Sequence, residues 1–279
     1  MSRRREIDRR LTTLAQISGV MGSMKKLAQM ESHKVSRLLQ YQQQSLHTIQ
    51  RAAADFQSAY PLPESLPADQ AGAVCVIWGS ERGFCGDFNQ RLVAQLSALR
   101  REDKVPEASY VVIGRRCAIA MQRSGKIGHA LPGAGVTDEI QSVLSSLIET
   151  LAGCSMGSLT VLSHHADHGG IRAVQVLPPE FTGEETPGFR TPVRLNLKPR
   201  VFLKELLDHY LIASLYGLAY ESLLAECQQR MQHLDAAMHR IEEQSASLHS
   251  KRNMLRQEEI TEELEIILLN TATLPGASS

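Results

Sequence analysis

Residues 223–260 read LLAECQQRMQHLDAAMHRIEEQSASLHSKRNMLRQEEI, and this segment sets the architecture of the chain. It has no proline or glycine, and its apolar side chains recur every three, four or seven residues. Such a heptad pattern predicts a helix that buries one stripe against another helix. The pattern spans 202–270 with only Gly217 interrupting it, so the helix would be roughly 100 Å long. Its predicted seam is Leu206, Tyr210, Ala213, Tyr220, Leu224, Cys227, Met231, Leu234, Met238, Ile241, Leu248 and Leu255, then, after a phase shift, Ile260, Leu264 and Ile267.

A second heptad pattern occupies the other end of the chain, from Arg3 to about Ala59. It contains no proline, and Gly19 and Gly22 are its only glycines. We expect a helix of roughly 80 Å that ends before the proline-rich segment PLPESLP at 61–67. Its predicted seam is Ile7, Leu11, Leu14, Met21, Ala28, Val35, Leu39, Leu46, Ile49, Ala53 and Phe56, with Ser18, Lys25, Ser32 and Gln42 as polar interruptions.

Between these segments, short apolar runs alternate with amphipathic ones, which is typical of an α/β domain. The predicted elements are strands at 71–78, 109–114, 157–165 and 171–178, helices at 87–99 and 115–122, and a helix capped by Thr137 with Asp138 and Glu139 in its first turn. Two terminal helices can pair only antiparallel if the insert joins their near ends. The predicted fold is therefore an α/β insert domain with Rossmann-like strand–helix alternation, carried on a long antiparallel two-helix coiled coil. The expected boundaries are 1–59, 60–201 and 202–279.

The composition excludes several classes of protein. Lys plus Arg and Asp plus Glu both number 30 among 279 residues, a balance that argues against a nucleic-acid binder. No run of some 20 apolar residues exists to span a membrane. The five cysteines are scattered without a CxxC pair, so neither a disulfide framework nor a zinc site is expected. The N-terminus has arginines but no apolar core, so we expect no secretory signal and a mature start at Met1 or Ser2.

The segment WGSERGFCGDFNQRL, residues 78–92, poses the question of a nucleotide site, because a strand, a glycine-rich turn and a helix can cradle phosphate. Its glycines, Gly79, Gly83 and Gly86, do not have P-loop or dinucleotide spacing, and no Lys-Ser/Thr pair follows them. Asp87 would place a negative charge at the helix start, where phosphate binds. We therefore expect no direct nucleotide binding, and a tight turn with Asp87 as a capping residue.

Metal and nucleophilic sites are the other candidates for chemistry. His164, His165 and His168 are close in sequence, but no nearby Cys or Glu completes a zinc set, and the segment resembles a hairpin turn. Cys85 lies in a turn without a neighbouring His or Lys to activate it. We expect no metal, no cofactor and no catalytic residue. The polar groups Arg256, Gln257, Thr261 and Glu263 fit either a solvated surface or a partner contact, and sequence physics leaves both open.

Three motifs together resemble the gamma subunit of rotary F-type ATP synthases. REIDRRLTTLAQISGVMGSMKKLAQ at 5–29 is similar to the family's EIRxRIxSVxNTxKITxAMxMVA, and ERGFCGDFN at 81–89 is similar to DRGLCGGLN. LAECQQRM at 224–231, with RNMLRQEEITEELEII at 252–267, resembles LASExAARM and YNxxRQxxITxEIxEI. The resemblance covers nearly the whole chain, and the last motif is the most specific.

The resemblance implies a non-catalytic central-stalk rotor that couples ion flow through the membrane sector to ATP synthesis or hydrolysis. The implied partners are the alpha and beta subunits of the catalytic hexamer, an epsilon-type subunit and the membrane c-ring. The implied location is the cytoplasmic face of the bacterial plasma membrane. Carried over by matching positions, Arg256 and Gln257 bond a catalytic-subunit loop, Thr261 and Glu263 belong to the same coupling region, Arg230 is linked to coupling, and Met24 faces the lever loop of a catalytic subunit.

Departures from the family pattern sharpen the hypothesis. AQISGV replaces NTxKIT, so Gly19 and Gly22 would loosen the helix by roughly 1 kcal/mol each. No ion-ring contact is carried over, because RTPVRLNLKPR at 190–200 lacks the acidic and tyrosine pattern. This divergence suggests the alternative, sodium-pumping branch of bacterial F-type ATPases. The competing functions are a coiled-coil scaffold or adaptor with an embedded α/β domain, and an enzyme that uses the insert.

Overall fold

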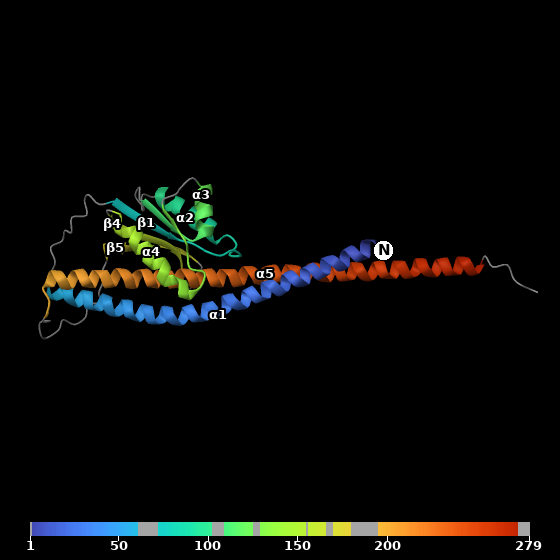
Figure 1. Ribbon diagram of the computed structural model, residues 1–279, viewed down its shortest axis with the longest axis horizontal. Coiled ribbons are helices and arrows are strands. Elements are labelled where there is room, and N and C mark those ends of the chain that lie inside the picture. The colour runs from blue at the N-terminus through green and yellow to red at the C-terminus, as the bar shows by residue number, and fades with distance from the viewer. Residues whose placement is uncertain are drawn as a thin grey trace, which may run out of the picture. The chain divides into compact units, whose positions relative to one another are not determined.

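The computed structural model describes residues 2–60, 72–101, 109–124, 129–154, 156–165, 170–179 and 195–272. It is mostly helical, with one mixed five-stranded sheet and a long helix at each end (Figure 1). The elements are α1 (Ser2–Ala59), β1 (Gly72–Trp78), α2 (Phe88–Arg101), β2 (Ser109–Ile113), α3 (Arg115–Arg123), β3 (His129–Leu131), the 3-10 turn η1 (Thr137–Glu139), α4 (Ile140–Ala152), β4 (Met156–His164), β5 (Ile171–Leu177) and α5 (Pro199–Ala272). The chain divides into two compact units, one of Met1–Leu27 with Gln232–Ser279 and one of Ala28–Met231.

The two long helices confirm the periodicity prediction. Every predicted seam position of α1 is buried or partly buried, and so is every predicted seam position of α5 up to Leu255. The predicted continuation at Ile260, Leu264 and Ile267 is different, because these side chains are 46%, 55% and 58% exposed. Heptad spacing thus locates the apolar stripe correctly, but it does not indicate how far along the helix a partner covers that stripe.

The first unit contains the start of α1 and the end of α5. Ion pairs join the two segments: Arg4 with Glu259 at 3.0 Å, Asp8 with Arg252 at 3.6 Å, and Lys25 with Asp235 at 2.5 Å. Residue numbers rise on one helix as they fall on the other, so the segments run in opposite directions. Exposed ion pairs contribute little stability, whereas the buried Ile7, Met21 and Leu234 supply the apolar contact area.

The second unit contains the sheet, whose strand order is β3-β2-β1-β4-β5. The first four strands are parallel, and β5 pairs antiparallel with β4. The four predicted strands and their hairpin are confirmed, although most of the hairpin turn, at 166–169, lies outside the described residues. Strand β3 was not predicted, because its three residues are too few to show an alternating pattern.

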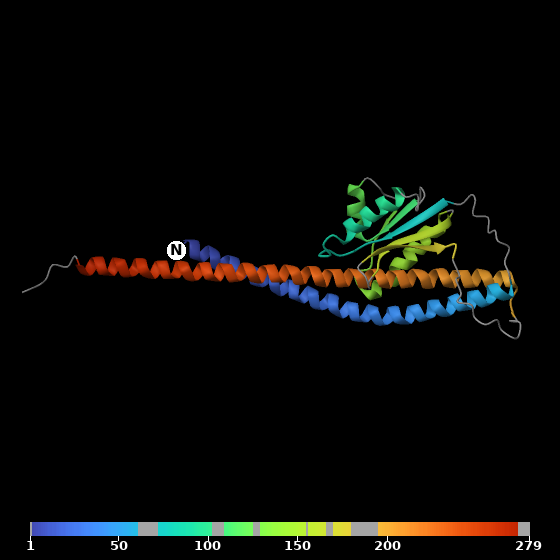
Figure 2. The same ribbon diagram turned by 180° about the vertical axis from the view of Figure 1, so that it is seen from behind.

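Helices cover both faces of this sheet. Alternate residues of β1 point to opposite sides, so Val74, Val76 and Trp78 pack toward α4 and the long helices, while Cys75 and Ile77 pack toward α2 and α3. Figure 2, seen from behind, shows the sheet between these two layers. The second unit is therefore a three-layer α/β structure in which parts of the terminal helices form one layer.

The predicted helix cap at Thr137 is wrong. Thr137 is the first residue of η1, its Oγ1 donates a hydrogen bond to Glu31 of α1 at 2.8 Å, and Val136 precedes it as the cap residue without a side-chain bond. Glu139 reaches back instead, and its carboxylate accepts the N–H of Gly135 at 2.6 Å. The hydroxyl was expected to satisfy a local N–H, but a carboxylate from a distant helix provides a charged acceptor, which makes a stronger bond.

Candidate functional site

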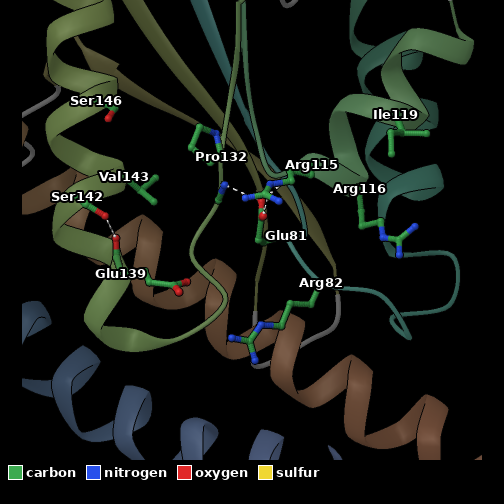
Figure 3. Close-up of a pocket in the computed structure, with 11 residues that line it drawn as sticks. Glu81, Arg82, Arg115, Arg116, Ile119, Pro132, Glu139, Ser142, Val143 and Ser146 are labelled. Carbon is green, nitrogen blue, oxygen red and sulfur yellow. Dashed lines mark hydrogen bonds and ion pairs between the residues drawn. The ribbon is translucent and has the colours of Figure 1, made fainter.

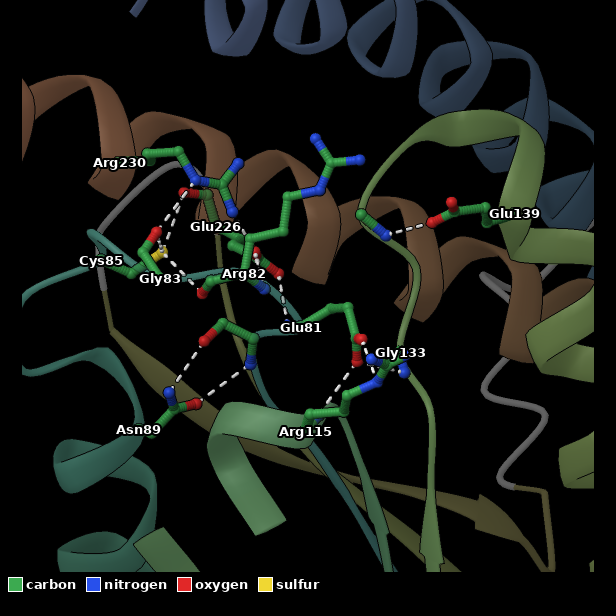
Figure 4. Close-up of polar contacts among 12 residues, drawn as sticks. Glu81, Arg82, Gly83, Cys85, Asn89, Arg115, Gly133, Glu139, Glu226 and Arg230 are labelled. Atoms are coloured by element: carbon green, nitrogen blue, oxygen red, sulfur yellow. Dashed lines mark hydrogen bonds and ion pairs between the residues drawn. The ribbon is translucent and has the colours of Figure 1, made fainter. Parts of the chain in front are cut away.

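The loop after β1 is held on α5 by a buried carboxylate. Glu226 is 3% exposed and accepts the N–H of Glu81 at 3.3 Å and the N–H of Arg82 at 3.2 Å. Four residues along α5, Arg230 forms an ion pair with Glu226, and its Nε donates to the carbonyl of Gly83 at 3.3 Å. Figure 4 shows these two side chains pointing from α5 into the loop. We call Glu226, Arg230 and the loop 81–85 the α5 latch.

Burial dominates the electrostatics of the α5 latch. It raises the pKa of Glu226 to about 7, although the guanidinium of Arg230 and the two backbone N–H groups act in the opposite direction. Burial is the largest single influence on Arg230 and lowers its pKa, but the Glu226 carboxylate together with the neighbouring Cys85 and Cys227 raises it by more, so the net shift is upward. A buried ion pair is stable only when its remaining polar atoms are bonded. The loop supplies these bonds, which ties its backbone to the helix.

A second carboxylate, Glu81, lies at the N-terminus of α3. Glu81 accepts the N–H of Arg115 at 3.0 Å and the N–H of Gly133 at 2.8 Å, and it pairs with the Nε of Arg115 at 2.8 Å. Arg115 is the first residue of α3, and a helix N-terminus attracts anions. The acid in the anion position is thus Glu81 at α3, whereas the sequence pointed to Asp87 at α2. Glu81 was missed because its partners lie 34 and 52 residues away.

The glycines of this region allow close packing of backbone segments. A Cβ on Gly79 would lie 2.3 Å from the Cβ of Cys117. Gly114 has a φ of 102°, and a Cβ there would lie 2.6 Å from the carbonyl oxygen of Ser80. Asn89 closes the turn, because its Oδ1 accepts the N–H of Ser80 at 3.0 Å and its Nδ2 donates to Oγ at 2.8 Å. These positions need glycine for contact between protein segments.

A pocket of about 780 Å³ opens beside this loop, between α3 and α4 (Figure 3). Its charged lining is Glu81, Arg82, Arg115, Arg116 and Glu139. Some of these charged groups are already bonded within the chain, since Glu81 forms an ion pair with Arg115 and Glu139 accepts a backbone N–H. In the described part of its lining, no cysteine or histidine stands beside the two serines, and the geometry assembles no nucleophile with a general base.

His164, one of the three histidines weighed as metal ligands, is a buried structural residue. Its ring stacks on Phe88 with centroids 3.7 Å apart, and its Nε2 lies 2.8 Å from the carbonyl oxygen of Phe88, so Nε2 carries the donated hydrogen. Burial lowers the pKa of His164 to about 4. His168 lies outside the described residues. Across the described ranges, no group of three or more His, Cys, Asp or Glu side chains is arranged to hold a metal ion.

The thiols lie in surroundings that disfavour the reactive thiolate. Burial raises the pKa of Cys85 to about 12, and the neighbouring Glu226 adds to the shift. The Cys85 thiol also contacts the carbonyl oxygen of Gly83 at 3.5 Å. Burial likewise raises the pKa of Cys75 and Cys117 to about 12 and that of Cys227 to about 11. A nucleophilic role for Cys85 therefore lacks support, because a nucleophilic cysteine requires a lowered pKa.

The six predicted coupling residues lie in different environments. Arg230 is 5% exposed inside the second unit, where it belongs to the α5 latch. Met24 is partly buried on α1 in the first unit. The remaining four are exposed along the end of α5: Arg256, Gln257, Thr261 and Glu263. Thr261 donates to the carbonyl of Gln257 at 2.9 Å, so its hydroxyl is satisfied within the helix.

Helical spacing sorts the exposed residues into two pairs. Gln257 and Thr261 are four residues apart and share one face of α5, and Arg256 and Glu263 are seven apart and share another. All four lie on one short stretch of the helix in the first unit, whereas Arg230 belongs to the second unit. The residues that the sequence did not single out are Glu81, Glu226 and Glu31, whose partners are all remote along the chain.

No helix in the described part of the chain combines the length and hydrophobicity that a bilayer crossing requires. The family model described as ATP synthase matches residues 3–270. The ATP synthase gamma chain of Streptococcus suis is 22% identical over 288 residues, covering 96% of this chain and 98% of that one. The gamma chain of Nitratiruptor sp. is 26% identical over 200 residues, covering 67% and 68%.

A solved structure shares the fold. The rotor of the Euglena gracilis mitochondrial ATP synthase, in rotational state 1, superposes with a TM-score of 0.66 at 14% identity. The match covers 93% of this chain and 99% of the Euglena chain. The family model spans nearly the whole sequence, and the curated relatives carry one shared description. The chain belongs to the ATP synthase family, as one of its gamma chains.

Proposed function

We propose that this gamma-family chain is the central-stalk rotor subunit of an F-type ATP synthase, which couples ion movement through the membrane sector to ATP synthesis or hydrolysis by rotation. The observation that carries the proposal is the form of the terminal helices. α1 and α5 have 58 and 74 residues, far longer than the α/β unit needs for its own core. A subunit that transmits force over a distance requires such elements.

The two helices would act as an antiparallel coiled coil. Three ion pairs with opposite residue order and the buried seam in the first unit support this pairing. We propose functional domains of 1–59 and 202–279 for the shaft and 60–201 for the globular part. The helices would enter a hexamer of alpha and beta subunits, while the globular part would meet an epsilon-type subunit and the c-ring.

Coupling contacts would be made by the exposed end of α5 and by α1. Arg256 and Gln257 would bond a loop of the catalytic subunit, and Thr261 and Glu263 would extend this contact. Their exposure supports the proposal, since a partner can reach these side chains. Met24 would face a second catalytic loop as an uncharged surface that lets the loop pass. Arg230 would act differently, through the α5 latch.

The chain would have no catalytic role of its own, and no nucleotide would bind to it directly. In the loop that resembles a phosphate cradle, Glu226 already accepts the N–H groups of Glu81 and Arg82, and Glu81 accepts those of Arg115 and Gly133 beside it, which supports this view. The complex would lie on the cytoplasmic face of a bacterial plasma membrane. Catalysis would reside in neighbouring subunits, whose sites the turning shaft drives through their cycle.

Reconstitution tests the proposal. The full chain is mixed with alpha and beta subunits of the same complex, and the stoichiometry and ATPase activity of the product are measured. We expect one chain per hexamer and an activity above that of alpha and beta alone. The absence of a stable complex would refute the rotor function and favour the scaffold alternative. Dependence of the membrane-bound complex on sodium or on protons then tests the sodium-pumping hypothesis.

A further inference from the structure

Several polar bonds attach the loop 81–85 to α5. Both carboxylate oxygens of Glu226 are used, because Oε2 accepts from the N–H of Glu81 and Oε1 accepts from the N–H of Arg82 and from Arg230. The Nε of Arg230 then reaches Gly83. Apolar contacts are not directional, whereas these charged hydrogen bonds have a fixed geometry. They therefore specify one position of the loop on the helix.

A separate contact fixes the neighbouring loop to α1. Glu31 accepts the N–H of Thr137 at 3.1 Å and its hydroxyl at 2.8 Å, and Lys34 pairs with Asp138 at 2.6 Å. In both contacts a helix carboxylate accepts backbone N–H donors from a segment that follows a parallel strand: Glu31 accepts the N–H of Thr137, and Glu226 accepts those of Glu81 and Arg82. The α/β part is thereby attached to both long helices within the second unit.

We propose that Glu226 is a positioning residue of the rotor, which, with Arg230, locks the loop 81–85 to α5 so that the globular part and the shaft turn as one body. This inference rests on the proposed rotor function. Arg230 then contributes to coupling through Glu226 and the loop backbone, and it does so without touching a partner subunit. Within the α5 latch, the Glu226 side chain bonds directly to Glu81, Arg82 and Arg230.

The variant Glu226→Gln tests this directly. A glutamine has one acceptor oxygen, so it turns an NH₂ group toward one of the two backbone donors, and it removes the charge facing Arg230. Shape and volume stay nearly constant. Glu221→Gln is the matched control, because Glu221 is also a largely buried α5 carboxylate that pairs with an arginine, Arg172 at 2.6 Å, and has no bond to the loop 81–85 among the described contacts.

Hydrogen exchange of the isolated full chain is the first measurement. In Glu226→Gln, the amides of Glu81 and Arg82 should exchange about tenfold faster than in wild type, which corresponds to the loss of one hydrogen bond. The same amides should be unaffected in Glu221→Gln. Unchanged exchange at Glu81 and Arg82 in a folded Glu226→Gln chain would overturn the proposal, whatever the rotor assay shows.

Coupling in membrane vesicles is the second measurement, made on the whole complex. The ions pumped per ATP hydrolysed should fall by about twofold or more in Glu226→Gln, while the complex still hydrolyses ATP and Glu221→Gln keeps the wild-type ratio. A wild-type ratio with fast amide exchange would overturn the role in coupling. Failure of the wild-type chain to assemble would instead refute the rotor function, and the exchange result would be unaffected by it.

Arg230→Lys keeps the test decisive if Glu226→Gln does not fold. Lysine retains the charge beside Glu226 but lacks the second N–H that reaches the carbonyl of Gly83. Exchange in the loop should then rise less than in the glutamine variant, with a correspondingly smaller loss of pumping. Wild-type exchange and wild-type pumping in Arg230→Lys would count against the α5 latch.

Discussion

At the scale of single residues, two glycines of this chain have opposite effects on the stability of the fold. Gly19 lies inside α1, and a Cβ added there would meet nothing within 4 Å. Gly114 has a φ of 102° and lies against the backbone of Ser80. The helix runs through Gly19 without interruption, so this glycine lowers stability without serving packing, whereas Gly114 is required by the fold.

Replacing each glycine by alanine tests this distinction. Gly19→Ala should raise the free energy of unfolding by about 1 kcal/mol, the helix-propensity difference between the two residues. Gly114→Ala should lower it by at least about 1 kcal/mol, because alanine tolerates neither the backbone angle nor the close carbonyl. Urea unfolding of the full chain measures both. A loss of stability in Gly19→Ala would contradict this interpretation, because the added methyl would then have to clash with another part of the chain.

Glu226 gives stability a defined pH dependence. Its pKa rises from 4.5 to about 7 on folding, mainly through burial, so the folded chain binds more protons than the unfolded chain between these values. Stability from this group is present below pH 4.5 and is lost as the pH rises to about 7. Wild type should therefore lose stability relative to Glu226→Gln across this window and stay constant above it. Thermal unfolding of both proteins from pH 4.5 to 8 measures the difference, and a constant difference would contradict the assignment.

His164 should act in the opposite direction. Burial lowers its pKa from 6.5 to about 4, so the folded chain excludes a proton that the unfolded chain accepts. Its contribution is present above pH 6.5 and is lost as the pH falls toward 4. His164→Phe keeps the ring stack on Phe88, removes the titrating group and loses the Nε2 hydrogen bond. The stability advantage of wild type over this variant should therefore shrink as the pH falls. Thermal unfolding over a pH series measures this, with His33→Gln, at an exposed histidine, as the control. A wild-type advantage that grows on acidification would contradict a neutral His164 ring in the folded chain.

At the scale of elements, local patterns predicted structure wherever local interactions determine it. Hydrophobic periodicity located both long helices and four strands, because burial of a stripe or a face leaves a repeat in the sequence. The errors arose where distant partners decide. Thr137 bonds Glu31, 106 residues away, and Glu81 bonds an N–H 34 residues away. The sequence therefore pointed to the loop 81–85 and to Arg230, but not to Glu226, which bonds to both, or to Glu81.

The helix α5 changes character along its length, and paired substitutions can measure this. Leu234 is fully buried and Leu264 is 55% exposed, both in the first unit. Leu234→Ala should cost about 2–5 kcal/mol of unfolding free energy, since it leaves a cavity in the seam. Leu264→Ala should change it by less than about 0.5 kcal/mol. Chemical unfolding compares the two, and equal losses would mean that the end of α5 is also covered within the chain.

At the scale of the whole molecule, the described contacts divide the chain's residues between internal and external tasks. Glu226 and Arg230 of the α5 latch are buried, and the Glu31 contact is partly buried and internal to the second unit, so both suit a fixed connection between the sheet and the helices. Arg256, Gln257 and Glu263 are exposed, so they suit contact with another subunit. A rotor needs internal contacts that hold its parts rigidly together and exposed residues that contact other subunits. Without the first, torque applied at one end of the subunit would not reach the other.

Arg256 allows these tasks to be separated in one experiment. Because it is exposed, Arg256→Ala should leave the unfolding free energy of the isolated chain within about 0.5 kcal/mol of wild type. In the assembled complex it should lower coupled turnover by about tenfold, the effect of losing one charged hydrogen bond to a partner. Arg252→Ala is the matched control, one turn earlier on α5, because Arg252 pairs with Asp8 of the same chain at 3.6 Å. Vesicle-based ATP synthesis measures both variants. Equal turnover in the two would remove Arg256 from the coupling surface, whereas a deficit confined to Arg256→Ala would show that the exposed end of α5 acts on a neighbouring subunit.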